Sequence, residues 1–433
     1  MKQINEHIYE EKGMRLHLIP TTKFKTLHMI AKFRTKLNRE DITKRALLSY
    51  VLRQGTKNNP TRSELEGKLD ELYGAGLGID DGKRGENHII SFRLELANDK
   101  FIPNAPNMMQ QGINLLREVV FDPNASNGKF AEDVFNRERE TLRQRIRSVK
   151  EDKMSYAQMR LIDEMCEGES YSLHVHGYES DLESISASDL YAYYEKMIAN
   201  DELDLYILGD FNLETAKETA INAFGRNAEP KKIKLTQVQS KHVSKLRELV
   251  EKENIQQAKL HIGYRTHCTY RDPEYYALQV FNGIFGGFPN SKLFMNVREK
   301  HSLAYYAASR LESHAGLMFV FSGIAPDDYS KAREIIELQL KDMKAGDFTE
   351  EILEETKGLI INDILETLDH PQGIIELKYQ QVLAGENTTP DELIEGIRAV
   401  SKEDVLAAAE KIEEDMVYLL TSDGGASDEQ AAI

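Results

Sequence analysis

The residues best suited to electrostatic catalysis lie in one string of the second half, NSKLFMNVREKHSLAYYAASRLESHAGLMFVFSGI at 290–324. Its first part is helical in pattern and carries Arg298, and near Tyr305 the pattern changes to a hairpin that turns at 314–316. A guanidinium at a helix end and a phenol at the start of an adjacent strand can donate hydrogen bonds into one cleft. The alternative is a structural salt bridge and a core tyrosine.

Two histidine-containing segments raise the question of a metal or a nucleophile. His174 and His176 could begin a metal site, but no acidic or cysteine residue has matching spacing, so we expect a surface loop. His267 precedes Cys268, and adjacent residues on a strand point to opposite faces. This pair is therefore poorly placed for nucleophilic catalysis.

The stretch IFGGFPNSK at 284–292 contains Gly286 and Gly287. It is not a phosphate-binding P-loop, because the Walker spacing is absent. A tight turn is the favoured interpretation of the two glycines.

The helices and strands that position these residues are predicted from the spacing of apolar residues along the sequence. In the first half, alternation predicts strands and 3.6-residue periodicity predicts helices. Thr61 and Glu64 resemble a capping box. The expected strands are at 14–21, 26–35, 86–97 and 202–210, and the expected helices are at 43–54, 61–74, within 106–166 and at 186–199.

The second half repeats the first. AKFRT at 31–35 matches IGYRT at 262–266, and the same offset carries RALLSYVL at 45–52 onto YALQVFNG at 276–283. Near the ends of the two halves, residues 185–210 match 400–423. Agreement at both ends indicates a duplicated domain. We expect an α+β fold of two tandem homologous sandwiches, each a mostly antiparallel sheet covered by helices.

Breaks in periodicity set the expected boundaries. The first domain spans 1–225, a linker rich in positive charge spans 226–248, and the second domain spans 249–421. The small, polar tail at 422–433 is expected to be disordered.

Composition excludes several classes of function. The chain has 433 residues, enough for two cores, and its net charge of −17 argues against nucleic-acid binding, which depends on Lys and Arg. No apolar run approaches the length of a membrane span, so no membrane association is expected. Two cysteines, Cys166 and Cys268, cannot make a disulfide framework. We expect a reducing cytoplasm.

The run from Arg298 to Tyr305, Arg-Glu-Lys, two residues, then Leu-Ala-Tyr, resembles the second-half signature of the inverzincin peptidases. This group contains pitrilysin, insulysin and the mitochondrial processing peptidases. The duplicated halves also match, so the resemblance covers essentially the whole chain and implies one half of a clamshell. In this resemblance, Gly286 and Gly287 look like a shortened glycine-rich loop that contacts substrate.

In that family the first half carries His-x-x-Glu-His on a helix, followed by Gly-Thr, and the histidines bind zinc while the Glu acts as general base. The segment ALLSYVLRQGT at 46–56 occupies this frame. Ala46 and Tyr50 stand at the histidine positions, Ser49 stands at the Glu position, and the third ligand aligns on or next to Arg145. A methyl, a hydroxyl, a neutral phenol and a cation are unsuited to zinc, so no zinc is expected here.

The resemblance is to the zinc-less subunit of a two-subunit bacterial enzyme. It implies that Arg298 and Tyr305 are supplied to the zinc site of a zinc-bearing paralogous partner, which hydrolyses unfolded peptides. This chain would then be inactive alone. Two alternatives remain open: a peptide-binding or assembly subunit with no catalytic share, and a homodimeric remnant that binds peptide.

Overall fold

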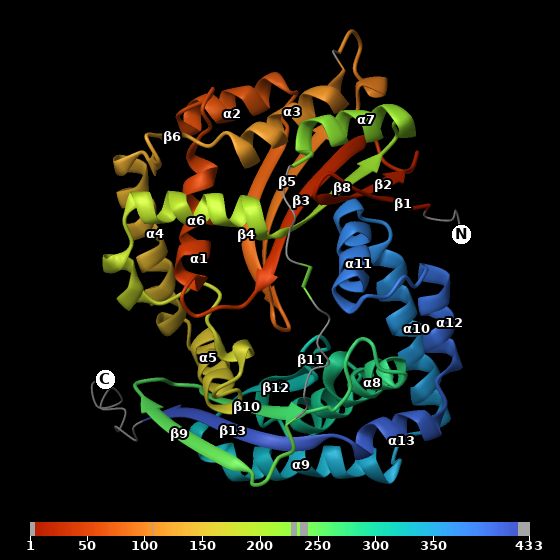
Figure 1. The fold of residues 1–433 in the computed structure, drawn as a ribbon. Coiled ribbons are helices and arrows are strands. Elements are labelled where there is room, and N and C mark those ends of the chain that lie inside the picture. Colours follow the sequence, from red (N-terminus) through yellow and green to blue (C-terminus); the bar gives the residue numbers. More distant parts are fainter. Residues whose placement is uncertain (1–4, 106, 227–231, 234–240, 423–433) are drawn as a thin grey trace, which may run out of the picture. The chain divides into compact units, whose positions relative to one another are not determined.

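The computed structural model describes residues 5–105, 107–226, 232–233 and 241–422, and the chain divides into two compact units (Figure 1). The first unit comprises Met1–Ser148, Leu173–Lys234 and His370–Glu376. The second comprises Val149–Ser172, Leu235–Asp369 and Leu377–Ile433. Apart from Ser422, the tail expected to be disordered lies outside the described residues.

The first unit is built on a six-stranded sheet in the order β1-β2-β8-β3-β5-β4. Its neighbouring strands are antiparallel except for the parallel pair β2 and β8. The strands are β1 (His7–Glu11), β2 (Met14–Pro20), β3 (Thr26–Lys36), β4 (Gly76–Arg84), β5 (Asn87–Ala97) and β8 (Glu202–Gly209).

One apolar core joins this sheet to its helices. The Thr61 and Glu64 capping box, predicted from the sequence, is present at the start of α2. The elements are α1 (Ile42–Val51), α2 (Arg62–Glu71), α3 (Met108–Phe121), the small hairpin β6 (Ala125–Ser126) and β7 (Lys129–Phe130), α4 (Glu132–Glu151), α6 (Ala187–Asn200) and α7 (Leu213–Phe224).

The second unit holds a five-stranded sheet in the order β11-β12-β10-β13-β9. Only β13 and β9 are parallel among its neighbouring pairs. The strands are β9 (Arg247–Glu253), β10 (Ala258–Arg265), β11 (Ala304–Glu312), β12 (Leu317–Ile324) and β13 (Glu413–Ser422). Thus β9 begins inside the segment 226–248 that was expected to be a linker, and much of that segment lies outside the described residues.

Helices cover both faces of this second sheet. One face shares a core with α8, α9, α10, α12 and α13, and the other packs on α5. The bounds are α5 (Lys153–Met165), α8 (Tyr275–Asn282), α9 (Tyr329–Ala345), α10 (Glu350–Thr367), α12 (Pro390–Ala399) and α13 (Lys402–Glu410), and α11 (Pro371–Ala384) belongs partly to each unit. Among the described helices, none combines the length and apolarity needed to cross a bilayer.

The predicted duplication is confirmed by the strand order. Without β1, the first sheet reads β2-β8-β3-β5-β4, and the second, read from its other end, reads β9-β13-β10-β12-β11. Each parallel pair lies at the same end of this order. The α+β fold with two mostly antiparallel, helix-covered sheets is therefore confirmed.

The arginine of the repeated string has the same role in both sheets. Arg34 in β3 donates from Nε to Oε2 of Glu202 in β8 at 2.9 Å. Arg265 in β10 donates from Nε to Oδ2 of Asp415 in β13 at 2.8 Å. Both guanidiniums are almost completely buried, so each carboxylate compensates a cation that would otherwise be costly inside the protein.

Helix α5 follows the helices of the first half in sequence but packs in the second unit. A Cβ on Gly263 in β10 would lie 2.3 Å from Sδ of Met165, so α5 lies in close contact with the sheet at this glycine. The two packing units are therefore not contiguous in sequence, and the expected division at 225 and 249 stays a prediction.

Candidate functional site

Helix α1, which carries the segment aligned with the zinc motif, is fixed to its sheet by Arg45. This buried guanidinium donates to the Phe33 carbonyl oxygen and to Oδ2 of Asp201, each at 2.6 Å. It also donates to the Tyr193 hydroxyl at 3.1 Å. The position of α1 is consequently set by charge-assisted hydrogen bonds as well as by apolar packing.

One motif position on α1, Ser49, contacts the carboxylate of Asp81 on the edge strand β4. Ala46 is fully buried, and Ser49 donates from Oγ to the Ala46 carbonyl oxygen at 2.8 Å and to Oδ1 of Asp81 at 3.3 Å. Burial raises the pKa of Asp81 to about 6, although His176, Ser49 and then Arg45 act in the opposite direction. Ser49 is thus a hydrogen-bond donor rather than a base.

Tyr50 and Arg145 lie close enough to interact electrostatically. Burial raises the pKa of Tyr50, Asp81 raises it further, and the charge of Arg145 on α4 lowers it. The phenol is therefore neutral near pH 7. The structure brings the four aligned positions, Ala46, Ser49, Tyr50 and Arg145, to one region of the first unit.

This donor set does not fit a catalytic zinc ion. A methyl offers no lone pair, the Ser49 hydroxyl is directed at oxygen acceptors, and Tyr50 is a neutral phenol beside a guanidinium. Zinc sites require deprotonated, electron-donating ligands, and a nearby cation opposes a metal ion.

The sequence does not indicate that an acidic residue, Asp81, interacts with His176. His174 and His176 lie between short helical turns in a loop, as predicted, but His176 is half-buried and interacts with the charge of Asp81. Burial lowers the pKa of His176, so its imidazole is neutral at pH 7. Asp81 comes from β4, far away in sequence, and no spacing rule could have linked it to this loop.

The prediction that His267 and Cys268 lie on a strand is wrong. Strand β10 ends at Arg265, and His267 has a left-handed backbone with φ of +52°, so the two residues are not on a strand. Burial raises the pKa of the Cys268 thiol to about 12. Cys268 is therefore not a nucleophile, because its thiol stays protonated.

Arg298 lies in a helical turn at Phe294–Lys300. Its side chain is 44% exposed, with the guanidinium 4.6 Å from the centre of the Phe294 ring and Nε 3.6 Å from Oε1 of Glu299. Glu299 is itself half exposed, so this ion pair is weak and screened by solvent. The guanidinium is available to another molecule.

Tyr305 lies at an irregularity in β11, the edge strand of the second sheet. The register with β12 shifts between Ala304 and Tyr306, and Tyr305 is 72% exposed. Bulges at sheet edges change the direction of a side chain and are enriched next to active sites. The turn carrying Arg298 packs against the same strand.

Gly286 has a clear packing role. The two glycines lie in a helical turn at Gly283–Gly287, and a Cβ on Gly286 would lie 2.5 Å from Oγ of Ser309 and 2.7 Å from its backbone nitrogen. A Cβ on Gly287 would be 3.0 Å from Nδ2 of Asn282. The close approach of this turn to β11 requires Gly286, and substrate contact by either glycine stays a prediction.

Comparisons with known proteins show to which family this chain belongs. A family model described as "Peptidase M16 inactive domain" matches residues 184–359. The chain is 43% identical over 430 residues to the Bacillus subtilis protein named "Probable inactive metalloprotease YmfF", across 99% of this chain and 100% of that one. The chain belongs to the M16 family of inverzincin peptidases.

Two further comparisons extend this result. The crystal structure of a conserved protein from Enterococcus faecalis V583 has a TM-score of 0.88 and 34% identity, covering 97% of this chain and 99% of that one. The Bacillus subtilis protein named "Uncharacterized zinc protease YmxG" is 24% identical over 274 residues, 61% of this chain and 66% of that one. This M16 chain is thus related to zinc proteases while matching the family's inactive domain.

Proposed function

We propose that this chain is the zinc-less subunit of a heterodimeric processing peptidase. It supplies Arg298 and Tyr305 to the active site of a zinc-bearing paralogue that cleaves unfolded peptides. The observation that carries the proposal is that both donors are solvent-exposed beside one edge strand, while the metal positions on α1 hold residues that do not fit zinc.

The chemistry assigns separate tasks to the two chains. The partner's zinc, held by its His-x-x-Glu-His motif, supplies Lewis acidity and an activated water. The Arg298 guanidinium and the Tyr305 hydroxyl of this chain donate hydrogen bonds to the carbonyl oxygen as it becomes a tetrahedral oxyanion. One such donor contributes about 3 kcal/mol to the transition state.

The relatives support the division of tasks. Bacillus subtilis has one relative whose name describes a probable inactive metalloprotease and another whose name describes a zinc protease. An organism with both kinds of chain can assemble the pair proposed here.

We also propose a cytoplasmic location, because the two cysteines are buried and not joined in a disulfide.

The test combines this chain with a paralogue from the same organism that carries an intact His-x-x-Glu-His motif. Hydrolysis of an unstructured fluorogenic peptide is measured for each chain alone and for the mixture, and native mass measurement reports the heterodimer. Only the mixture should be active. Arg298→Ala should lower kcat about 100-fold to 1,000-fold with the heterodimer intact.

Arg310→Ala is the matched control, because Arg310 is an exposed arginine on the same strand β11. It should leave kcat within about twofold of the wild-type mixture. Full activity of the Arg298→Ala mixture would instead favour an assembly or peptide-binding subunit with no catalytic share. A homodimer that does not bind the paralogue would favour the third possibility, a peptide-binding remnant.

A further inference from the structure

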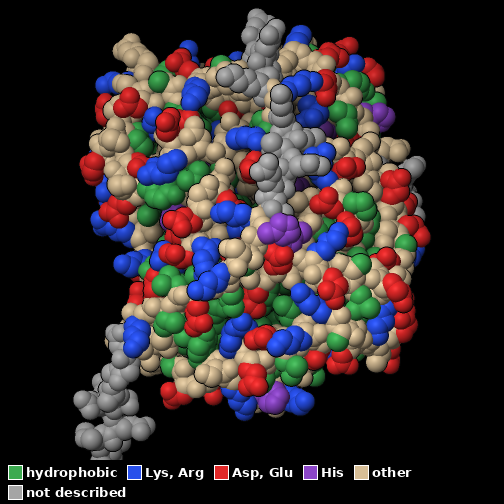
Figure 2. Space-filling view, turned by 60° about the horizontal axis from the view of Figure 1, so that its bottom comes forward, with side chains coloured by type: hydrophobic (Ala, Val, Ile, Leu, Met, Phe, Trp, Pro, Cys, Tyr) green, Lys and Arg blue, Asp and Glu red, His purple; other side chains and the backbone are tan. Residues whose placement is uncertain are grey.

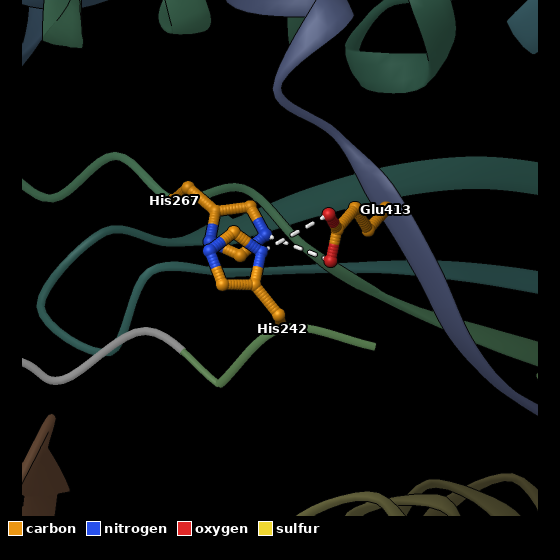
Figure 3. Close-up of side chains that lie close together, drawn as sticks. All are labelled: His242, His267 and Glu413. Carbon is orange, nitrogen blue, oxygen red and sulfur yellow. Dashed lines mark hydrogen bonds and ion pairs between the residues drawn. The ribbon is translucent and has the colours of Figure 1, made fainter. Parts of the chain in front are cut away.

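Three side chains of the second unit converge from separate parts of the chain, and Figure 3 shows them facing one another. His242 precedes β9, His267 follows β10, and Glu413 begins β13. Their potential ligand atoms all lie within 4.8 Å of one another. We propose that these three residues, called here the His₂Glu cluster, bind one zinc ion.

The spacing of the donors suits a tetrahedral ion. Nδ1 of His242 lies 3.3 Å from Oε1 of Glu413, and Nε2 of His267 lies 3.1 Å from Oε2. Bonds of about 2.1 Å in a tetrahedron place neighbouring ligand atoms about 3.4 Å apart. The two distances end on different oxygens of Glu413, so the two nitrogens and one oxygen must close to this spacing from separations of at most 4.8 Å to hold one ion.

The donor types select the class of metal. Two imidazole nitrogens and one carboxylate form a ligand set known from zinc sites that keep an open fourth position. Magnesium and calcium prefer oxygen ligands, so they are poor candidates. Cobalt(II) accepts the same ligands as zinc and gives an absorption signal.

The carboxylate is held in its charged form by its surroundings. The backbone N–H of Val243 donates to Oε2 of Glu413 at 2.9 Å. This bond, together with His242 and His267, lowers the pKa of Glu413 to about 2. The backbone donor of Val243 thus fixes the position of the Glu413 carboxylate independently of the two imidazoles.

The two histidines are arranged around this carboxylate. Their rings stack with centroids 4.9 Å apart and an interplanar angle of 28°. His267 is held in a left-handed backbone conformation that is uncommon for residues other than glycine. The nearest cation in sequence, Lys241, is directed to Glu169, with Nζ 3.4 Å from Oε1.

The cluster is reachable from solvent. The His242 side chain is 84% exposed and that of Glu413 is 36% exposed, whereas His267 is mostly buried. The face drawn in Figure 2 carries histidine side chains at its surface, with acidic and basic side chains interspersed around them. An ion can enter from the His242 side, and water can fill the fourth position.

Bound zinc would join the segment that precedes β9 to the start of β13 and to the turn after β10. This link between three segments does not depend on the proposed function. The ligands share no residue with the aligned motif on α1.

The test uses untagged full-length protein stripped with EDTA and dialysed. Zinc chloride is titrated by calorimetry, zinc content is measured by mass spectrometry, and cobalt(II) absorption reports the ligand geometry. We expect one zinc per chain. Removal of a residue that only orients a metal ligand by a hydrogen bond weakens metal binding about 10-fold to 100-fold. Removal of a ligand itself should have a larger effect. We therefore expect His242→Ala and Glu413→Gln each to weaken zinc binding at least about 100-fold.

His370→Ala is the control, because His370 is an exposed histidine of the first unit, and it should leave zinc affinity unchanged. His242→Ala decides the outcome, because the exposed His242 can be replaced without disturbing a core, and circular dichroism checks the fold. Zinc binding that is equally tight in His242→Ala and Glu413→Gln, or no zinc in the wild-type chain, would overturn the proposal.

Discussion

Oγ of Ser49 lies 3.3 Å from Oδ1 of Asp81, so a hydroxyl on α1 and a carboxylate on β4 meet at the position aligned with the family's general base. Asp81 is nearly inaccessible to solvent, and its Oδ2 has no hydrogen-bond donor among the described residues. A buried carboxylate with incomplete hydrogen bonding is costly in its charged form. The charged form of Asp81 therefore destabilises the fold at neutral pH.

Asp81→Asn should stabilise the protein at pH 7. The pKa of Asp81 is raised from 3.8 to about 6, so between pH 4 and 6 the folded chain holds a proton that the unfolded chain loses. The free energy of unfolding consequently falls as pH rises through this window. The difference corresponds to at most about 3 kcal/mol.

Urea denaturation of the wild type and Asp81→Asn at pH 4, 5, 6 and 7 measures this effect. The two curves should coincide near pH 4, and the variant should become more stable as pH increases. A constant difference at every pH would show that packing, and not titration of Asp81, separates the two proteins.

Asp201→Asn should destabilise the first unit by about 3 kcal/mol. This substitution removes the charge that compensates Arg45, whose side chain is 1% exposed, and an unpaired buried cation costs about 3–5 kcal/mol. The free energy of unfolding in urea is the measurement. Glu66→Gln, which breaks an exposed pair with Arg62, should change it by less than about 1 kcal/mol.

Gly286→Ala should destabilise the second unit by about 1–3 kcal/mol, because its Cβ would overlap the backbone nitrogen of Ser309. Gly358→Ala is the matched control. A Cβ at Gly358 in α10 meets nothing within 4 Å, so the alanine should stabilise the helix by up to about 1 kcal/mol. Equal effects of the two substitutions in urea denaturation would contradict the packing role of Gly286.

The sequence predicted features that depend on local periodicity and on repetition. The strands appear as alternation of apolar and polar residues, the duplication as repeated strings, and the degenerate motif on α1 as a short run of fixed spacing. The repeated arginines Arg34 and Arg265 match because each compensates an acidic residue on the neighbouring strand of its own sheet.

Features that depend on distant parts of the chain left no such signal. The helical pattern of α5 does not indicate that Met165 packs against Gly263 rather than in the first unit. Likewise, His242, His267 and Glu413 come from three separate segments, and only the strand order of the second sheet brings them together.

Tyr305→Phe should lower kcat of the mixture with the zinc-bearing paralogue about 100-fold, because it removes only the hydroxyl proposed to stabilise the oxyanion. Tyr306→Phe is the adjacent control, since that half-buried residue is expected to have no catalytic contact, and its activity should not change. The double variant with Arg298→Ala should lose less than the product of the two single effects, because groups that act on one oxyanion are not additive. Strict multiplication of the two effects in steady-state kinetics would mean that Arg298 and Tyr305 act on different steps or different atoms.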